Sequence, residues 1–144
     1  MNVIAIVIGS EASPKPIIAI TDTAVINDGK KVSFLAQRTV PTGVKFVESG
    51  VIYTANADLA DSMSLANIGG AVRSKAAAYN TANGQMRMTL SSREGTAITV
   101  YLRAYLTYVE NGEYVTIYTD VYSASTVTSG DIDTGIEEGE DFDF

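Results

Sequence analysis

The residues whose types most suggest chemistry are acidic and lie near the C-terminus. Asp133-Thr134-Gly135 spells the triplet of the aspartic proteases, in which two carboxylates share a proton in a buried loop. Here the triplet lies in an acidic run, with no room for the rest of a protease lobe. Asp131 and Asp133 also begin like an EF-hand loop, but the fifth and sixth places, which need an oxygen ligand and a glycine, hold Gly135 and Ile136. We therefore predict no catalytic pair and no calcium loop here, and only loose cation binding stays open.

The rest of the chain lacks the side chains that most catalytic sites use. Its 144 residues include no His, Cys or Trp, which removes imidazole bases and ligands, thiolates and disulfides. There is no P-loop, no GxGxxG, no Ser-x-x-Lys and no Asn-x-Ser/Thr sequon. We predict a protein that is not an enzyme and has no catalytic residue, cofactor or metal site.

The net charge of −7 is concentrated at one end of the chain. Residues 1–130 contain ten acidic and ten basic side chains, whereas DIDTGIEEGEDFDF (131–144) contains seven acids and no base. A neutral body with an acidic end attracts phosphate poorly, so we predict no nucleic-acid partner.

The N-terminus carries an apolar run, Val3–Ile8, whose candidate contact residues are Val3, Ile4, Ile6 and Ile8. The run is too short to insert across a bilayer, and no basic residue precedes it as in a secretory signal. We therefore expect no membrane insertion and a start in the cytoplasm. We interpret Ser13-Pro14-Lys15-Pro16 as a stiff connector to the body of the domain. The all-apolar strand that precedes this connector would aggregate if it were left exposed, so it must be covered. The cover is either the chain's own sheet, which we favour, or another subunit.

The elements that would position these residues are mostly strands. Period-2 alternation, β-branched and aromatic residues predict strands over 16–26, 31–39, 44–54, 85–92, 96–109 and 113–122. Turn formers such as Pro41-Thr42-Gly43 and Asn111-Gly112 separate them. An Ala-rich segment with Asn56 as a cap predicts a short helix or long loop near 56–68. For residues 71–79 we favour a strand over a continuation of that helix. We expect an arm and Pro linker (1–16), a β-sandwich domain (17–125) and an acidic tail (126–144).

Six of the eight tyrosines lie in one stretch, TVYLRAYLTYVENGEYVTIYTDVY (99–122). Asn111-Gly112 predicts a type I′ hairpin, because both central residues of that turn need positive φ. The resulting register pairs Val109 with Tyr114, Thr107 with Thr116, Tyr105 with Tyr118, Arg103 with Asp120 and Tyr101 with Tyr122 on one face. The opposite face pairs Tyr108 with Val115, Leu106 with Ile117, Ala104 with Thr119 and Leu102 with Val121, and it is the core side.

The first face is a candidate interface, because tyrosine combines a rigid ring with a hydroxyl and is enriched at protein contacts. Its candidate residues are Tyr101, Arg103, Tyr105, Tyr114, Tyr118, Asp120 and Tyr122. The alternative is that these rings only shield the sheet.

VYLRAYLTY and YVTIYTDVY, with KFVESGVIYT and NGQMRMTLSS before them, resemble the closing strands of immunoglobulin-like and fibronectin type III-like modules of phage structural proteins and bacterial surface proteins. The resemblance covers about residues 44–122. It implies an antiparallel sandwich of that type, although the apolar arm and the Ala-rich insertion depart from the usual module.

At the other terminus, Phe142 and Phe144 are candidates for docking on a neighbouring subunit. We therefore expect an assembling subunit of a homo- or hetero-oligomer, whose partners are other copies of itself or other virion or surface proteins. The first hypothesis is a phage virion component, such as a capsid decoration, head-fibre or tail protein, assembled in the host cytoplasm. The alternative is a bacterial cell-surface adhesion module or filament subunit whose leader has been removed. A small-molecule or carbohydrate-binding module is weaker, because no Trp or polar cluster accompanies the rings.

Overall fold

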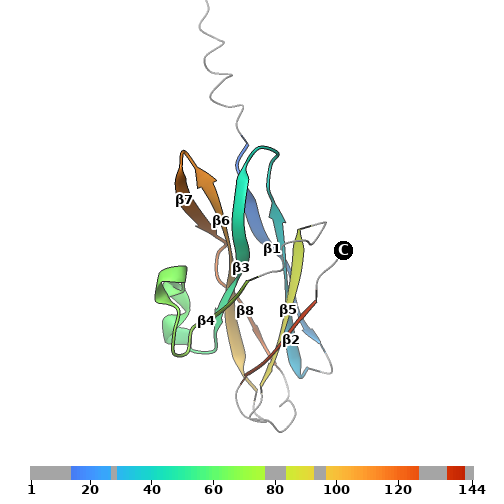
Figure 1. Ribbon diagram of the computed structural model, residues 1–144. Coiled ribbons are helices and arrows are strands. Elements are labelled where there is room, and N and C mark those ends of the chain that lie inside the picture. Colours follow the sequence, from blue (N-terminus) through green and yellow to red (C-terminus); the bar gives the residue numbers. More distant parts are fainter. Residues whose placement is uncertain (1–13, 27–28, 77–83, 93–96, 127–135, 142–144) are drawn as a thin grey trace, which may run out of the picture.

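Two antiparallel β-sheets pack face to face and form a sandwich (Figure 1). A computed structural model describes residues 14–26, 29–76, 84–92, 97–126 and 136–141. The elements in these ranges are β1 (Ile17–Ile26), β2 (Lys31–Thr39), β3 (Lys45–Thr54), the 3-10 helices η1 (Ala57–Ser62) and η2 (Leu65–Asn67), β4 (Arg73–Ala76), β5 (Gln85–Ser92), β6 (Thr99–Glu110), β7 (Glu113–Tyr118), β8 (Tyr122–Ser125) and β9 (Ile136–Asp141). Sheet A has the order β1-β2-β5-β9, and sheet B has the order β4-β3-β6-β7, with β8 also pairing with β6. The predicted all-β sandwich is confirmed at this level.

The strand positions follow the alternation of apolar and polar residues. β2 and β5 occupy the predicted ranges, and β1 and β3 each begin one residue later than predicted. Gly43 has φ 94° and follows Pro41, whose carbonyl accepts a hydrogen bond from the Val44 N–H at 3.2 Å. The predicted Pro-Thr-Gly turn is therefore present, with glycine at the position that needs a positive φ.

The core lies between the two sheets, where the inward faces of the strands meet. Its most enclosed side chains are 0–1% exposed and come from both sheets: Val32, Phe34, Met88 and Leu90 from sheet A, and Val51, Tyr53, Val100, Leu102 and Ala104 from sheet B. Burying a Val, Leu or Phe side chain of this kind contributes about 1.5–3 kcal/mol. This core fixes which face of each strand points inward.

Arg38 joins the two sheets at one point of the sandwich. Its guanidinium donates a hydrogen bond of 2.9 Å to the Ser49 hydroxyl of β3 and lies 4.7 Å from the centre of the Phe46 ring. Partial burial lowers the pKa of Arg38 from its ordinary value. A charged residue of β2 thus packs against an aromatic ring of the opposite sheet.

The Ala-rich insertion between β3 and β4 forms two short 3-10 helices, which confirms the prediction of a short helix or loop there. The Asn56 side chain caps η1 by accepting a hydrogen bond of 2.9 Å from the Asp58 N–H. The Ser64 hydroxyl caps η2 in the same way, accepting from the Ala66 N–H at 3.2 Å. The segment that follows is a strand, β4, as we favoured.

Part of the predicted acidic tail belongs to the sandwich. The backbone of residues 136–141 forms β9, which runs antiparallel to β5 at one edge of sheet A. The arm residues Val3, Ile4, Ile6 and Ile8, like Phe142 and Phe144, lie outside the described residues. Their proposed contacts with other subunits therefore stay predictions.

Candidate functional site

The tyrosine hairpin forms with the predicted register along its first half. β6 and β7 pair Glu110 with Glu113, Val109 with Tyr114, Tyr108 with Val115, Thr107 with Thr116, Leu106 with Ile117 and Tyr105 with Tyr118. The turn residues Asn111 and Gly112 have φ 53° and 81°, the positive values that a type I′ turn needs. The hydroxyls of Thr107 and Thr116 lie 2.7 Å apart, so the expected threonine pair is hydrogen-bonded.

The second half of the hairpin departs from the prediction. β7 ends at Tyr118, and the chain rejoins β6 as β8, with Leu102 opposite Tyr122 and Tyr101 opposite Ser123. The predicted pairs of Arg103 with Asp120 and of Tyr101 with Tyr122 are therefore wrong. One extra residue lies between the two ladders, which moves every later side chain to the other face.

The shift originates at Thr119. Its N–H donates to the Ala104 carbonyl at 3.0 Å, but the Ala104 N–H donates to the Thr119 hydroxyl at 3.0 Å instead of to the Thr119 carbonyl. The side chain therefore replaces the backbone in the ladder. The freed Thr119 carbonyl accepts hydrogen bonds from Arg103 Nε at 3.0 Å and Arg103 Nη2 at 2.8 Å.

The face that carries the tyrosines is covered within the chain by the insertion. Ile52, Met63, Val72 and Tyr105 form a second cluster of buried side chains on sheet B, and all four are 0–5% exposed. Leu59, Leu65, Tyr101, Tyr118 and Val121 pack against this cluster. Figure 1 shows η1 and η2, in green, on the side of sheet B away from sheet A. Tyr101, Tyr105 and Tyr118 share the face away from sheet A, as predicted. Tyr105 is buried there within the chain, which corrects its expected exposure, whereas Tyr101 and Tyr118 are partly buried and their interface role stays a prediction.

The hydroxyls of Tyr105 and Tyr118 have partners inside the chain. Tyr105 is 1% exposed, and its hydroxyl donates a hydrogen bond to the Glu48 carboxylate. The Tyr118 hydroxyl accepts a hydrogen bond of 3.1 Å from the Leu65 N–H at the start of η2. These contacts tie the insertion to the hairpin.

Arg103 is the connection between the insertion and the irregularity at Thr119. Besides its two bonds to the Thr119 carbonyl, it donates through Nη1 to the Met63 carbonyl at 2.9 Å. Its guanidinium carbon lies 5.0 Å from the centre of the Tyr118 ring, within the range of a cation–π contact. We interpret Arg103 as a structural residue that holds two carbonyls and one ring.

Tyr114 is the one candidate tyrosine that stays fully open. It lies beside the hairpin turn, opposite Val109, and is 77% exposed.

At the same end of the sandwich, Lys15 of the Pro-rich linker donates a hydrogen bond to the carboxylate of Glu110. This hydrogen bond and the negative charge of Glu110 raise the pKa of Lys15 above its ordinary 10.5. We call this end, with Lys15, Val109, Glu110 and Tyr114, the hairpin end.

Asp120 and Tyr122 lie away from the covered cluster. Asp120 is exposed and follows the end of β7. Tyr122 is 38% exposed and, as the partner of Leu102, is on the core-facing side of sheet B near its margin. It borders a pocket of about 280 Å³ that residues 20–23 of β1 also line.

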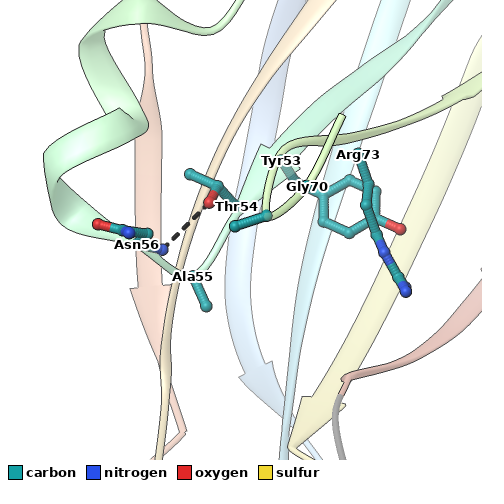
Figure 2. A pocket seen from close by; sticks show the side chains of 7 residues that line it. Tyr53, Thr54, Ala55, Asn56, Gly70 and Arg73 are labelled. Atoms are coloured by element: carbon teal, nitrogen blue, oxygen red, sulfur yellow. Dashed lines mark hydrogen bonds between the residues drawn. The ribbon is translucent and has the colours of Figure 1, made fainter. Parts of the chain in front are cut away.

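A second pocket, of about 380 Å³, lies where β3 meets the insertion and is lined by Tyr53, Thr54, Ala55, Asn56, Gly70, Ala71 and Arg73 (Figure 2). The Asn56 N–H donates to the Thr54 hydroxyl at 3.1 Å in its wall. Tyr53 is 0% exposed, and its hydroxyl has no hydrogen-bond partner among the described residues. The lining offers hydrogen-bonding groups to a small molecule or water, but no pair of groups arranged as nucleophile and base.

Neither a metal site nor a membrane span is seen in the part of the chain that the structure describes. Within those ranges, no three His, Cys, Asp or Glu side chains gather as metal ligands would. No helix there combines the length and the apolar character needed to cross a bilayer. No family model, curated protein or solved structure matches the chain.

Sequence reasoning missed the apolar surface of β1. Ile17 is 58% exposed, Val25 43% and Ile26 39%, although β1 was predicted as an ordinary strand of the body. The strand's apolar content was visible in the sequence, but its edge position was not. The Lys15–Glu110 contact was missed as well, because no local pattern joins residues that are far apart in the chain.

Proposed function

We propose that this chain is a structural protein that acts through protein–protein contacts, as a component of a phage virion. The observation that carries the proposal is the composition of the hairpin end. An open tyrosine, Tyr114, lies there beside the point where the N-terminal linker is held by the Lys15–Glu110 ion pair. Exposed tyrosine is typical of protein contacts, since it buries a large rigid ring at small entropic cost.

The position of the linker supports an assembly role. Pro16 is buried, whereas Pro14 and Lys15 are exposed, so the chain meets the body of the sandwich at Pro16. The segment before Pro14 contains the apolar run Val3–Ile8. An apolar run in the segment that precedes Pro14 would add to the contact surface that Tyr114 offers, which suits packing of subunits.

The strand order supports a sandwich of the immunoglobulin-like or fibronectin type III-like kind. β1, β2 and β5 in one sheet, with β3, β6 and β7 in the other, have the relative positions of strands A, B, E and C, F, G. β4 lies beside β3, as strand C′ does in the variable type. Together with the resemblance of residues 44–122 to modules of virion and surface proteins, this order favours a display or assembly module over a catalytic domain.

The location of the protein is the experiment that tests this function. Particles purified from a lysate of phage-producing cells that encode the chain are compared with washed envelopes of the same cells by quantitative mass spectrometry. We expect the chain in the particles, at a constant ratio to the major capsid protein. Recovery of the chain in the envelopes alone would indicate a cell-surface protein instead. Absence from both fractions would overturn the structural role.

A second experiment addresses the hairpin end itself. Tyr114→Ser removes the exposed ring without touching the core, and Thr116→Ser is a control nearby on the same strand. The Tyr114→Ser protein should fold normally but be incorporated into particles less efficiently than the control. If both variants are incorporated equally, the hairpin end is not a contact surface in the particle.

A further inference from the structure

The edge strand β1 has an unusual surface for a strand with one free side. It is the first strand of sheet A, so only one of its edges pairs with a strand of the described chain, which is β2. Three of the six exposed large apolar side chains in the described residues lie on it, namely Ile17, Val25 and Ile26. Long exposed apolar edges form intermolecular sheets unless something covers them.

A bulge near the middle of β1 changes which side chains share a face. Ile20 pairs with Ala36 of β2 and Asp22 with Leu35, so Thr21 is an extra residue, and its hydroxyl donates to the Leu35 carbonyl at 3.3 Å. Side chains opposite the buried Val32, Phe34 and Ala36 point to the core, and the alternate positions point outward. The outward set is Ile17, Ala19, Asp22, Ala24 and Ile26. Ile17 and Ile26 thus share a face, which their odd spacing would forbid in a regular strand.

The sequence of β1 is close to a palindrome about this bulge. IIAIT (17–21) reads forward much as DTAVI (22–26) reads backward. Two copies placed antiparallel about a two-fold axis at the bulge would set Ile17 opposite Ile26, Ile18 opposite Val25, Ala19 opposite Ala24, Ile20 opposite Thr23 and Thr21 opposite Asp22.

Four of the five pairs in this register join side chains of the same face, and the fifth, Thr21 with Asp22, lies at the bulge. Ile17 and Ile26 both point outward, as do Ala19 and Ala24, whereas Ile18 and Val25 both point to the core side. The only charged residue, Asp22, lies directly opposite Thr21 of the second copy, but the two Asp22 residues are diagonal neighbours across the two-fold axis, where their like charges oppose the pairing. Without the bulge the same register would set outward residues against core-facing ones, so the palindrome and the bulge are useful only together.

We propose that β1 pairs with β1 of a second copy of this chain, in the antiparallel register that sets Ile17 of each copy opposite Ile26 of the other. This inference rests on the proposed function. It names a second copy of the chain as one protein partner and β1 as the contact surface. The bulges interrupt the ladder at the centre, so the contact has two arms, each joining residues 17–20 to residues 23–26 of the second copy. Such a contact is small, and we expect a dissociation constant on the order of 10–100 µM.

The competing explanation is that the bulge and Asp22 keep the edge from pairing at all, since both are devices that natural sheets use for that purpose. The two explanations give opposite results in solution. Pairing requires a concentration-dependent dimer whose stability depends on residues 17 and 26, whereas a guarded edge requires a monomer at every concentration.

Charge variants test the register. In Ile17→Glu/Ile26→Glu each arm sets two glutamates opposite one another, whereas Ile17→Lys/Ile26→Glu sets lysine opposite glutamate and differs only at residue 17. Both positions are exposed, and Glu at 26 faces Lys31 of its own β2, so the fold should tolerate both variants. By sedimentation velocity up to about 500 µM, we expect the first variant to dimerise at least about tenfold more weakly than the second.

Cysteine cross-linking tests the same register without added charges. The chain has no cysteine, so Ile17→Cys and Ile26→Cys each introduce a single thiol. Directly opposite residues in an antiparallel pair lie about 4.5–5.5 Å apart at Cα, which suits a disulfide. A differently tagged mixture of the two variants should oxidise to a heterodimer, whereas Ile17→Cys alone should cross-link poorly.

Each result decides the proposal. A heterodimer specific to the mixture, together with rescue by the lysine–glutamate variant, supports it. Equal behaviour of the two charge variants, equal cross-linking of Ile17→Cys alone, or a monomer throughout would overturn it. Dimers that survive the glutamate variant but disappear when residues 1–13 are deleted would also overturn it, while a chain found in purified particles would keep the proposed function intact.

Discussion

Replacing Arg103 by methionine should destabilise the protein strongly. Methionine keeps a flexible apolar stem over the Tyr118 ring but removes three hydrogen bonds. Two of them end on the Thr119 carbonyl, at 3.0 and 2.8 Å, and one ends on the Met63 carbonyl at 2.9 Å. The substitution therefore leaves two carbonyl groups without their side-chain donor.

The expected magnitude follows from these groups. Thr119 and Met63 are 8% and 1% exposed, so water reaches their carbonyls poorly. An unsatisfied buried acceptor costs about 1–3 kcal/mol, and the lost cation–π contact adds about 0.5–1 kcal/mol. Because the contacts share one side chain and relax together, we expect Arg103→Met to lower the free energy of unfolding by about 2–4 kcal/mol.

Urea unfolding followed by far-ultraviolet circular dichroism measures this change, since the chain has no tryptophan to report on packing. Arg103→Lys restores the charge but not the planar fork, so it should recover only part of the loss, about 1–2 kcal/mol. Arg87→Met is a matched control, because the Arg87 side chain makes one hydrogen bond among the described side chains, to the Ser33 hydroxyl at 3.0 Å. It should cost about 1 kcal/mol.

The reasoning would be refuted by an Arg103→Met protein that unfolds within about 0.5 kcal/mol of the wild type. Such a result would mean that water or a shifted insertion satisfies both carbonyls at no cost. Limited proteolysis distinguishes a shifted insertion, since cleavage within residues 55–70 would then increase while the rest of the sandwich stays protected.

Four further predictions concern single positions. Tyr53→Phe should leave stability unchanged or raise it by up to about 1 kcal/mol in urea unfolding, since the hydroxyl is buried without a described partner; a clear loss would mean that a pocket ligand or water satisfies it. Gly50→Ala should cost more than about 2 kcal/mol by the same measurement, because its Cβ would lie 2.3 Å from a carbonyl oxygen of β4. Asn111→Ala should cost about 1 kcal/mol through its φ of 53°, whereas Asn111→Gly should be tolerated in a thermal melt. The ion pair of Lys15 with Glu110 should persist at pH 10.5 and be lost only as pH rises through the raised pKa of Lys15; side-chain NMR titration checks this, with Glu110→Gln returning Lys15 toward its ordinary titration.

Strands and turns were the predictable part of this fold, because their signals are local. The alternation in residues 31–39 and 85–92 predicted β2 and β5 at their observed bounds. Asn111-Gly112 predicted both the turn and the register of the adjoining pairs, since few other dipeptides accept two positive φ values. Asn56 predicted the start of the insertion's helix for a similar reason, its side chain being a good cap.

The covering of the tyrosine face was not predictable from the hairpin alone. A tyrosine on an outward face of a sheet can meet solvent, another subunit or a distant segment of its own chain, and the alternation is the same in each case. Met63 and Leu65 do carry apolar side chains in a polar, Ala-rich segment, which indicates that the insertion has something to cover. What they cover depends on how β3 and β6 pair, and that is a property of the tertiary fold.

The corrected register of the hairpin and the apolar face of β1 both come from irregular positions at which strict alternation fails. Thr119 lets one extra residue enter between β7 and β8, so Tyr122 leaves the face of Tyr101 and Arg103 never meets Asp120. Thr21 does the same in β1, where it brings Ile17 and Ile26 onto one face. In each case a threonine hydroxyl bonds to a backbone group of the neighbouring strand, so the irregularity is supported by its own side chain. A bulge therefore decides which residues can share a contact surface, and it does so most strongly at an edge strand, where the face that it assembles is also the face that a second copy can reach.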